Sequence, residues 1–150
     1  MAQSLFISYQ HLIFSVKHRQ PLLNPAWGDN LNRYLGYKFQ DIDCVPVQVN
    51  GHWNHVHCLF QMSKNHGLSA ICREIKRNSA IWVKTEIGVP NFSWQRGYAC
   101  FSVSPKSLDA VSEYIANQKE HHRKQTFEEE VNVFMNKFGV TGFDPQYFFE

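Results

Sequence analysis

The sequence of 150 residues lacks the features that would assign it to several specialised classes of protein. It has no run of about 18 apolar residues, so we expect no membrane-spanning helix. Its four cysteines are widely spaced and none forms a Cys-x-x-Cys pair, which favours free thiols in a reducing cytoplasm. It also lacks an internal repeat, a low-complexity tract and a long linker. We therefore expect a cytoplasmic protein that folds as a single domain over residues 1–150.

The chain has little net charge, but its basic and acidic residues are unevenly distributed along the sequence. The net charge is only +2, yet 14 of the 15 Lys and Arg residues lie in residues 1–125, and five of the 13 Asp and Glu residues lie in residues 126–150. A basic body with an acidic tail is compatible with a polyanionic partner. The aromatic content of 15% is high, and exposed aromatic rings would suit base stacking.

The clearest chemical pattern is the pair His55 and His57 within a strand-like stretch. Residues i and i+2 of a strand point to the same face, so both imidazoles converge, and two neutral imidazoles can bind a metal ion. Farther along, Tyr114 and Gln118 stand four residues apart in a helical pattern, which places them one turn apart on one face. Together these four side chains supply a nucleophile and three candidate metal ligands.

Apolar periodicity and turn signals predict the order strand, helix, hairpin, helix, strand and C-terminal helices. The predicted strands cover residues 5–16, 44–50, 53–61 and 98–103, and the predicted helices cover residues 25–41, 68–87 and 105–124, with a short final helix closed by Gly139. Pro46 predicts an edge strand or a bulge, and Asn50 with Gly51 predicts the hairpin turn. This order is typical of a ferredoxin-like (RRM-like) α+β fold with an antiparallel sheet and a tyrosine-bearing C-terminal helix.

Alternation along residues 53–61 predicts that the sheet has two different faces. Val56, Cys58 and Phe60 share one face, whereas His55 and His57 share the other. We therefore expect an apolar face for packing helices and a polar face for chemistry. In the predicted helix over residues 105–124, Tyr114, Gln118 and His121 fall on the flank of the apolar stripe.

Several short motifs in this order resemble the HUH single-tyrosine transposases, the small transposases of IS200-type insertion sequences and their REP-associated relatives. The motifs are YQHLIF at residues 9–14, KHR at residues 17–19, HVH at residues 55–57, WQRGY at residues 94–98, and YIANQ at residues 114–118 with HH at residues 121–122. The similarity extends from about residue 5 to residue 148, and several motifs together are far more specific than any one of them.

The resemblance implies cleavage and rejoining of single-stranded DNA at hairpin-bearing element ends through a covalent 5′-phosphotyrosine intermediate. By motif, Tyr114 corresponds to the nucleophile, and His55, His57 and Gln118 correspond to the ligands of a divalent metal. The resemblance also implies a homodimer, in which the tyrosine acts within its own subunit or in its partner. The family often has an acidic residue where this chain has Asn54. We expect that difference to alter histidine orientation or metal affinity without abolishing activity.

Physical chemistry supports these roles independently of the resemblance. Two imidazoles and one amide oxygen are neutral ligands, which leave a cation its full charge for an anionic phosphodiester. Such mixed ligands suit Mg²⁺ or Mn²⁺, although the histidines would also accept Zn²⁺. A phenol is easier to deprotonate than an alkyl alcohol and leaves more readily on reversal. The sequence does not decide which group is the general base, and the candidates are His121, Glu113 and a metal-bound water.

Basic and aromatic residues are candidates for contacts with the DNA. The candidates for phosphate contacts are Lys17, Arg19, Arg73, Lys76, Arg77 and Arg96, and those for base stacking are Trp94 and Trp82. A non-catalytic module that binds single-stranded nucleic acid is the rival prediction, because ferredoxin-like sheets bind such strands without chemistry. A structural zinc site drawn from His52, His55, His57, Cys58 and His122 is a third alternative. Replication initiators and relaxases share the histidine pair but usually need longer chains.

Overall fold

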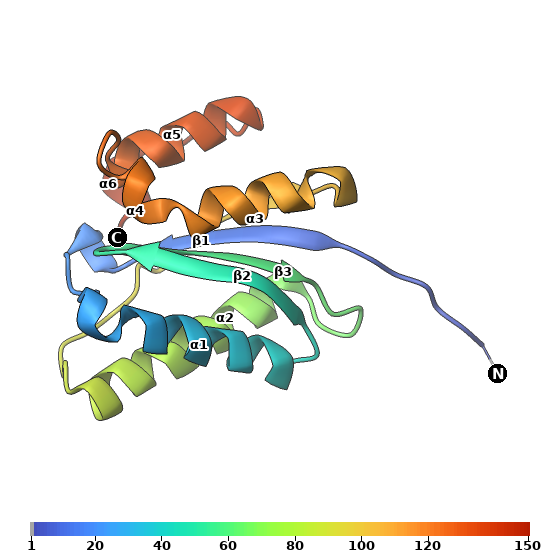
Figure 1. The fold of residues 1–150 in the computed structure, drawn as a ribbon, viewed down its shortest axis with the longest axis horizontal. Coiled ribbons are helices and arrows are strands. Elements are labelled where there is room, and N and C mark those ends of the chain that lie inside the picture. Colours follow the sequence, from blue (N-terminus) through green and yellow to red (C-terminus); the bar gives the residue numbers. More distant parts are fainter. Residues whose placement is uncertain (1) are drawn as a thin grey trace.

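A four-stranded antiparallel sheet lies between two layers of helices in the computed structural model, which describes residues 2–150. The strands are β1 (Tyr9–Ser15), β2 (Val45–His52), β3 (His55–Gln61) and β4 (Ala99–Val103), in the order β2-β3-β1-β4. One layer contains α1 (Pro25–Asp41) and α2 (Leu68–Trp82). The other contains α3 (Leu108–Ala116), α4 (Gln118–His121) and α5 (Phe127–Lys137) (Figure 1). The predicted ferredoxin-like α+β fold is confirmed.

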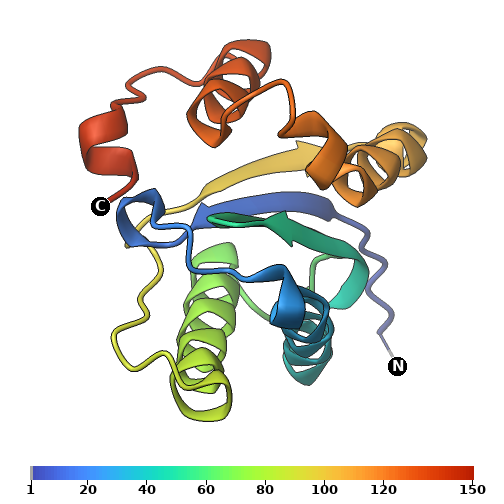
Figure 2. The ribbon, with the colours of Figure 1, turned by 60° about the vertical axis from the view of Figure 1, so that its left-hand side comes forward.

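Shorter elements complete the chain. Single turns of 3-10 helix cover Lys17–Arg19 and Pro105–Ser107, a π-helical turn covers Val83–Ile87, and α6 covers Pro145–Phe148. Figure 2 shows α6 beside the chain's C-terminus, on the same side of the sheet as α5. Among residues 2–150, no helix is long and apolar enough to cross a membrane.

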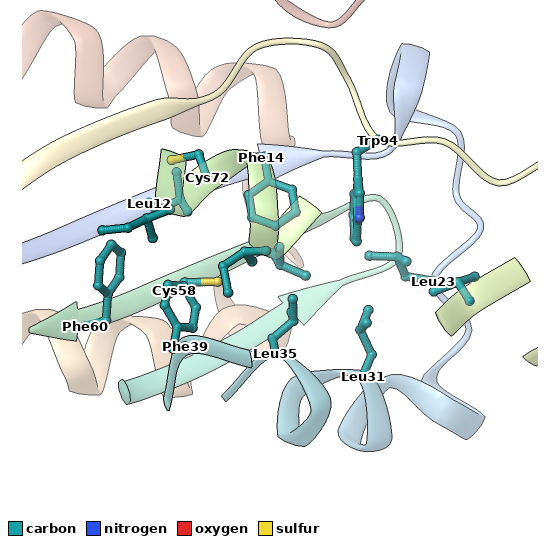
Figure 3. Packing of buried hydrophobic residues seen from close by; sticks show 14 of the residues in the cluster. Leu12, Phe14, Leu23, Leu31, Leu35, Phe39, Cys58, Phe60, Cys72 and Trp94 are labelled. Carbon is teal, nitrogen blue, oxygen red and sulfur yellow. The ribbon is translucent and has the colours of Figure 1, made fainter. Parts of the chain in front are cut away.

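The main hydrophobic core lies between the sheet and the layer of α1 and α2. Val56, Cys58 and Phe60 of β3 point into it, as predicted, and Phe60 stacks on Phe39 of α1 with ring centroids 4.5 Å apart (Figure 3). Full burial of one such apolar side chain contributes about 1.5–3 kcal/mol. The four cysteines are free thiols in the described part of the chain.

The opposite face of the sheet carries His55 and His57, as predicted, but it also carries apolar residues and is covered by helices. Ile13 and Phe101 pack against Val131 and Met135 of α5, and Leu59 packs against Ile115 of α3. The alternating pattern placed the histidines on the correct face. They are nevertheless enclosed between layers, because this face also carries apolar residues that need to be covered.

Side-chain caps and a bulge mark several boundaries of the helices and strands. The Oδ1 of Asn24 accepts a hydrogen bond from the backbone N–H of Ala26 at the start of α1. The register of β2 shifts between Pro46 and Gln48, so the edge strand has the bulge that Pro46 predicts. Thr126 caps α5 through its hydroxyl, and Gly139 adopts a φ of +68° after the helix.

The predicted helix over residues 105–124 is instead broken into two. It ends at Asn117 because Asn50 of β2 donates from its side chain to the carbonyls of Ile115, at 3.0 Å, and Ala116, at 3.2 Å. These carbonyls belong to the last turn of α3, where helical partners are missing. Ser104, which precedes the first turn, makes no side-chain hydrogen bond to the helix backbone in the described structure.

The hairpin turn also differs from the prediction. Asn50 and Gly51 lie within β2, where they pair with His57 and Val56, and the turn is formed by Trp53 and Asn54. The first predicted strand is shorter than residues 5–16, since regular pairing begins at Tyr9.

Candidate active site

Three histidines and one glutamate form a buried cluster between the sheet and α5. Their ligand atoms all lie within 4.8 Å of one another: His55 and His57 of β3, His122 after α4, and Glu130 of α5. The Nε2 atoms lie 3.4, 2.9 and 3.2 Å from Oε1 of Glu130, in that order. Both β3 histidines are fully buried and Glu130 is 1% exposed.

Each histidine is anchored through its other ring nitrogen. Nδ1 of His55 lies 2.8 Å from Oδ1 of Asn54, and Nδ1 of His122 lies 2.9 Å from the carbonyl of Gln125. A carbonyl only accepts, so Nδ1 of His122 carries a proton, and its Nε2 faces the Glu130 carboxylate. Two acceptors 3.2 Å apart attract only if a proton or a cation lies between them. This donor set therefore fits a metal ion, and the anchoring is typical of metal-ligating histidines.

Gln118 points into the same cluster. Its Oε1 lies 3.0 Å from Nε2 of His55 and 3.1 Å from Nε2 of His122, and its side chain is fully buried. The structure thus brings the three predicted ligands, His55, His57 and Gln118, together. Three imidazoles, one amide and one carboxylate contain more nitrogen than Mg²⁺ usually binds, and this set also suits Mn²⁺ and Zn²⁺.

Tyr114 of α3 reaches this cluster within the same chain. Its hydroxyl donates a short hydrogen bond to Oε2 of Glu130, and its ring stacks on His121 with centroids 4.3 Å apart. The ring of His57 is 6.1 Å away. The four residues predicted to supply nucleophile and ligands therefore lie side by side.

The surroundings shift the pKa values of Tyr114, Glu130 and His55. Burial, followed by the charge and hydrogen bond of Glu130, raises the pKa of Tyr114 well above its ordinary value. Burial alone would raise the pKa of the Glu130 carboxyl, but hydrogen bonds from His122, His55 and His57 hold it well below its usual range. Burial lowers the pKa of His55 to about 4. Tyr114 is therefore a neutral phenol beside an ionised carboxylate.

Sequence reasoning missed Glu130 altogether, and it considered His122 as a metal ligand only for a structural zinc site. Glu130 occupies a buried position on the same face of α5 as Phe127 and Phe134. A glutamate within an apolar helical stripe is the signal that would have marked it. Of the residues considered for a structural zinc site, His55, His57 and His122 lie in this cluster, whereas Cys58 points into the opposite core.

The two side chains predicted as candidates for the general base lie in different environments. Glu113 is exposed, whereas His121 stacks on Tyr114 and its Nε2 has no hydrogen-bond partner within residues 2–150. The carboxylate in contact with the phenol is that of Glu130.

Trp94 is a core residue, which corrects its prediction as a stacking platform for DNA. It is 5% exposed, its Nε1 donates to Oγ of Ser79 at 2.9 Å, and it packs edge-on against Phe14 (Figure 3). A base cannot stack on a ring whose faces are already covered. Trp82 is half-buried and stacks on Tyr34.

Three of the predicted cations line one pocket on the α2 side of the sheet. This pocket of about 290 Å³ is formed by Ser69, Cys72, Arg73, Lys76, Arg96 and Tyr98. Lys76 is half-buried, and its Nζ donates to the carbonyls of Arg96 and Gly97. Arg77 is exposed on the same helix. Lys17 and Arg19 lie in the turn after β1, and Arg19 pairs with Glu128.

Comparison with known proteins supplies an independent result. A family model described as "Transposase IS200 like" matches residues 4–118. Two solved structures are similar in fold. One is a Deinococcus radiodurans R1 protein described as a candidate transposase, with 21% identity, a TM-score of 0.62 and coverage of 79% of this chain and 98% of that one. The other is a REP-associated tyrosine transposase bound to a REP hairpin, with 16% identity, a TM-score of 0.59 and coverage of 81% and 74%.

At these identities the two structures show a shared fold only. No curated protein compared with the chain matches it significantly. The family match ends at Gln118, so His122 and Glu130 lie outside the matched segment.

Proposed function

The chain belongs to the family of IS200-like transposases, and from this premise we propose that it cleaves and rejoins single-stranded DNA through a covalent 5′-phosphotyrosine on Tyr114. The observation that carries the proposal is the convergence of the Tyr114 hydroxyl with His55, His57 and Gln118 in one buried cluster. A module that only binds nucleic acid would not need this arrangement.

We assign His55, His57 and Gln118 as ligands of a divalent cation, Mg²⁺ or Mn²⁺, with His122 and Glu130 as further donors. When bound, the cation polarises the phosphoryl oxygen and stabilises the leaving 3′ oxygen. The three imidazoles favour Mn²⁺ over Mg²⁺. Asn54 and Gln125 hold two of the rings in the orientation that ligation needs.

Tyr114 performs the covalent step. Its Oη attacks the phosphorus as the bond from phosphorus to the 3′ oxygen breaks, and the proton lost by the phenol is balanced by the proton that the 3′ oxygen takes up. The products are a 5′ phosphate joined to Tyr114 and a free 3′ hydroxyl. The reverse attack by a 3′ hydroxyl rejoins a strand without ATP. Tyr114 and Glu130 both line a pocket of about 410 Å³ beside α5, and the hydrogen bond between the phenol and the carboxylate would have to open before Oη attacks.

The basic pocket beside α2 is our candidate for binding the DNA hairpin. Arg73, Lys76 and Arg96 place three cationic groups around one pocket, and exposed Arg77 lies on the same helix. Each phosphate contact would release counterions and steepen the salt dependence of binding. The match to a transposase solved with a REP hairpin supports a hairpin as the partner. Lys17 and Arg19 remain candidates for contacts with the strand.

The family resemblance also predicts a homodimer that acts on DNA in the cytoplasm. The cluster is complete within one chain, so we propose that each subunit cleaves with its own Tyr114. Light scattering of the purified protein measures the number of subunits directly.

The test uses single-stranded hairpin oligonucleotides from the flanks of the protein's own gene, labelled at the 5′ or 3′ end. We expect the wild type to form a denaturation-resistant adduct that needs Mn²⁺ or Mg²⁺ and carries the label on the 3′ side of the cut. Tyr114→Phe should form none. Tyr37→Phe is the matched control, because Tyr37 is exposed on α1, on the other side of the sheet. Hairpin binding without an adduct under any metal would instead support the non-catalytic module.

A further inference from the structure

A fourth histidine lies behind the cluster and contacts one of its members. His11 of β1 is 2% exposed, and its Nε2 lies 2.8 Å from Nδ1 of His57. The two rings are 5.0 Å apart and inclined by 32°. β1 is a central strand, in which His11 pairs with Leu59 on one side and Phe101 on the other. The position of this ring is therefore fixed by the sheet.

Only one proton fits between the two facing nitrogens. If His57 offers the lone pair of Nε2 to a cation, its own proton must be on Nδ1, because a neutral imidazole carries one proton. Nε2 of His11 must then accept that hydrogen bond. In the same way, oxygen atoms of Asn54 and Gln125 accept hydrogen bonds from Nδ1 of His55 and His122.

From this arrangement we propose that His11 is a positioning residue, which fixes the ring orientation and proton position of the metal ligand His57. The proposal rests on the metal site proposed above. A histidine suits the position better than a carbonyl, because it can donate or accept. Without a cation, Nε2 of His57 donates to Glu130 at 2.9 Å and Nδ1 accepts from His11. With a cation, both tautomers reverse and the bond between the two rings is retained.

The packing around His11 supports an uncharged ring. Its imidazole is nearly perpendicular to the ring of Phe134, with centroids 5.2 Å apart, and Lys137 and Glu130, which carry opposite charges, line the same pocket. A buried carboxylate at residue 11 would need a compensating charge, whereas a neutral imidazole does not.

The test compares two substitutions of nearly equal size and shape. His11→Gln places an amide oxygen near the position of Nε2 and keeps an acceptor, whereas His11→Met removes it. Calorimetric titration with Mn²⁺ alone should show affinity lowered by about 10- to 100-fold in His11→Met and by about threefold or less in His11→Gln. Circular dichroism and the thermal midpoint check that both variants are folded.

A second measurement needs no substitution. Long-range ¹⁵N–¹H spectra of histidine-labelled wild type distinguish the two imidazole tautomers, and Zn²⁺ serves as a diamagnetic probe. In the Zn²⁺-loaded protein we expect His57 and His11 both to carry their protons on Nδ1. A proton on Nε2 of His11 in the loaded state would overturn the proposal.

The outcomes separate this proposal from the one on which it rests. Unchanged Mn²⁺ affinity in folded His11→Met overturns the role of His11 alone, and so do equal losses in both variants. A wild type that binds neither ion overturns both the metal site and His11. DNA cleavage can fail in every variant without affecting these binding measurements.

Discussion

Glu130 illustrates how a single residue sets the chemistry of its neighbours. A buried carboxylate costs several kcal/mol unless donors surround it, and here Tyr114 and three histidines do so. The same contacts that stabilise the carboxylate keep the phenol protonated. Nucleophile and acid–base partner are therefore coupled through one side chain.

Replacing this carboxylate by an amide should make the Tyr114 phenol easier to deprotonate. We expect Glu130→Gln to lower the pKa of Tyr114, because the variant removes the negative charge that opposes phenolate while burial is retained. The measurement is the absorbance of phenolate during an alkaline titration, with the curve of Glu130→Gln/Tyr114→Phe subtracted. If the subtracted signal shows Tyr114 ionising no earlier than in the wild type, the charge of Glu130 is not what raises its pKa.

Asn54 permits a graded test of histidine orientation. Its Oδ1 lies 2.8 Å from Nδ1 of His55, so an amide occupies the position where the family often has a carboxylate. Asn54→Asp keeps the acceptor and adds charge, and we expect a higher Mn²⁺ affinity. Asn54→Leu removes the acceptor and should weaken binding by about 10- to 100-fold. Calorimetry measures both, and equal affinities in the two variants would contradict an orienting role.

The candidate site was predictable where its residues are close in sequence. The pair on β3 follows from strand alternation, and Tyr114 with Gln118 follows from helical spacing, so local geometry suffices for each pair. Glu130 is different, since it contacts His57 from 73 residues away in the chain. No local pattern contains that contact, and an acidic run in residues 128–130 resembles a solvated surface.

At the scale of elements, helix and strand order could be predicted from periodicity, but boundaries set by tertiary contacts could not. The side chain of Asn50 ends α3 from a neighbouring strand, although the sequence around Asn117 favours continuation. The burial of Trp94 was also not predictable from the sequence, because a tryptophan two residues before Arg96 suggests a DNA-binding surface. Its burial depends on Phe14 and Ser79, which are distant in sequence.

The hairpin between β2 and β3 should be sensitive to a single methyl group. A Cβ at Gly51 would lie 2.5 Å from the carbonyl oxygen of His55, so the backbone that carries this ligand would have to move. We expect Gly51→Ala to cost about 1–3 kcal/mol of unfolding free energy, and to weaken Mn²⁺ binding. Urea denaturation and calorimetry measure the two effects.

The matched control for this substitution lies in α1. Gly28 is helical and a Cβ there would meet no atom within 4 Å, so Gly28→Ala should stabilise the protein by about 0.5–1 kcal/mol. A Gly51→Ala protein as stable as the wild type, with unchanged Mn²⁺ binding, would show that the close approach at His55 relaxes without consequence.

Over the whole molecule, the sheet separates two functions that we propose. The layers of α3–α5 and of α1 and α2 lie on opposite sides of the sheet (Figure 1). Tyr114 and Glu130 belong to the first layer, whereas Arg73 and Lys76 of the basic pocket belong to α2. The acidic residues near the C-terminus also do more than limit binding to polyanions. Glu130 belongs to the cluster and Glu128 pairs with Arg19, so part of the tail's charge is neutralised by contacts within the fold.

The location of all site residues in one chain leads to a prediction about the assembled protein. Tyr114→Phe lacks the nucleophile, and His57→Ala lacks a ligand. If Tyr114 serves the histidines of its own chain, a mixed dimer has one subunit without a nucleophile and one without a complete metal site. We therefore expect a mixture of the two variants, unfolded and refolded together, to form no DNA adduct with Mn²⁺.

The same mixture would behave differently if the tyrosine helix crossed to the partner. One composite site would then contain an intact Tyr114 and an intact His57, and adduct formation would return to about a quarter of the wild-type level, by the pairing statistics of a dimer. Wild type mixed with either variant checks that refolding preserves activity. Recovery of adduct would show that α3 leaves the position it has in this structure, since there Tyr114 is held against its own Glu130.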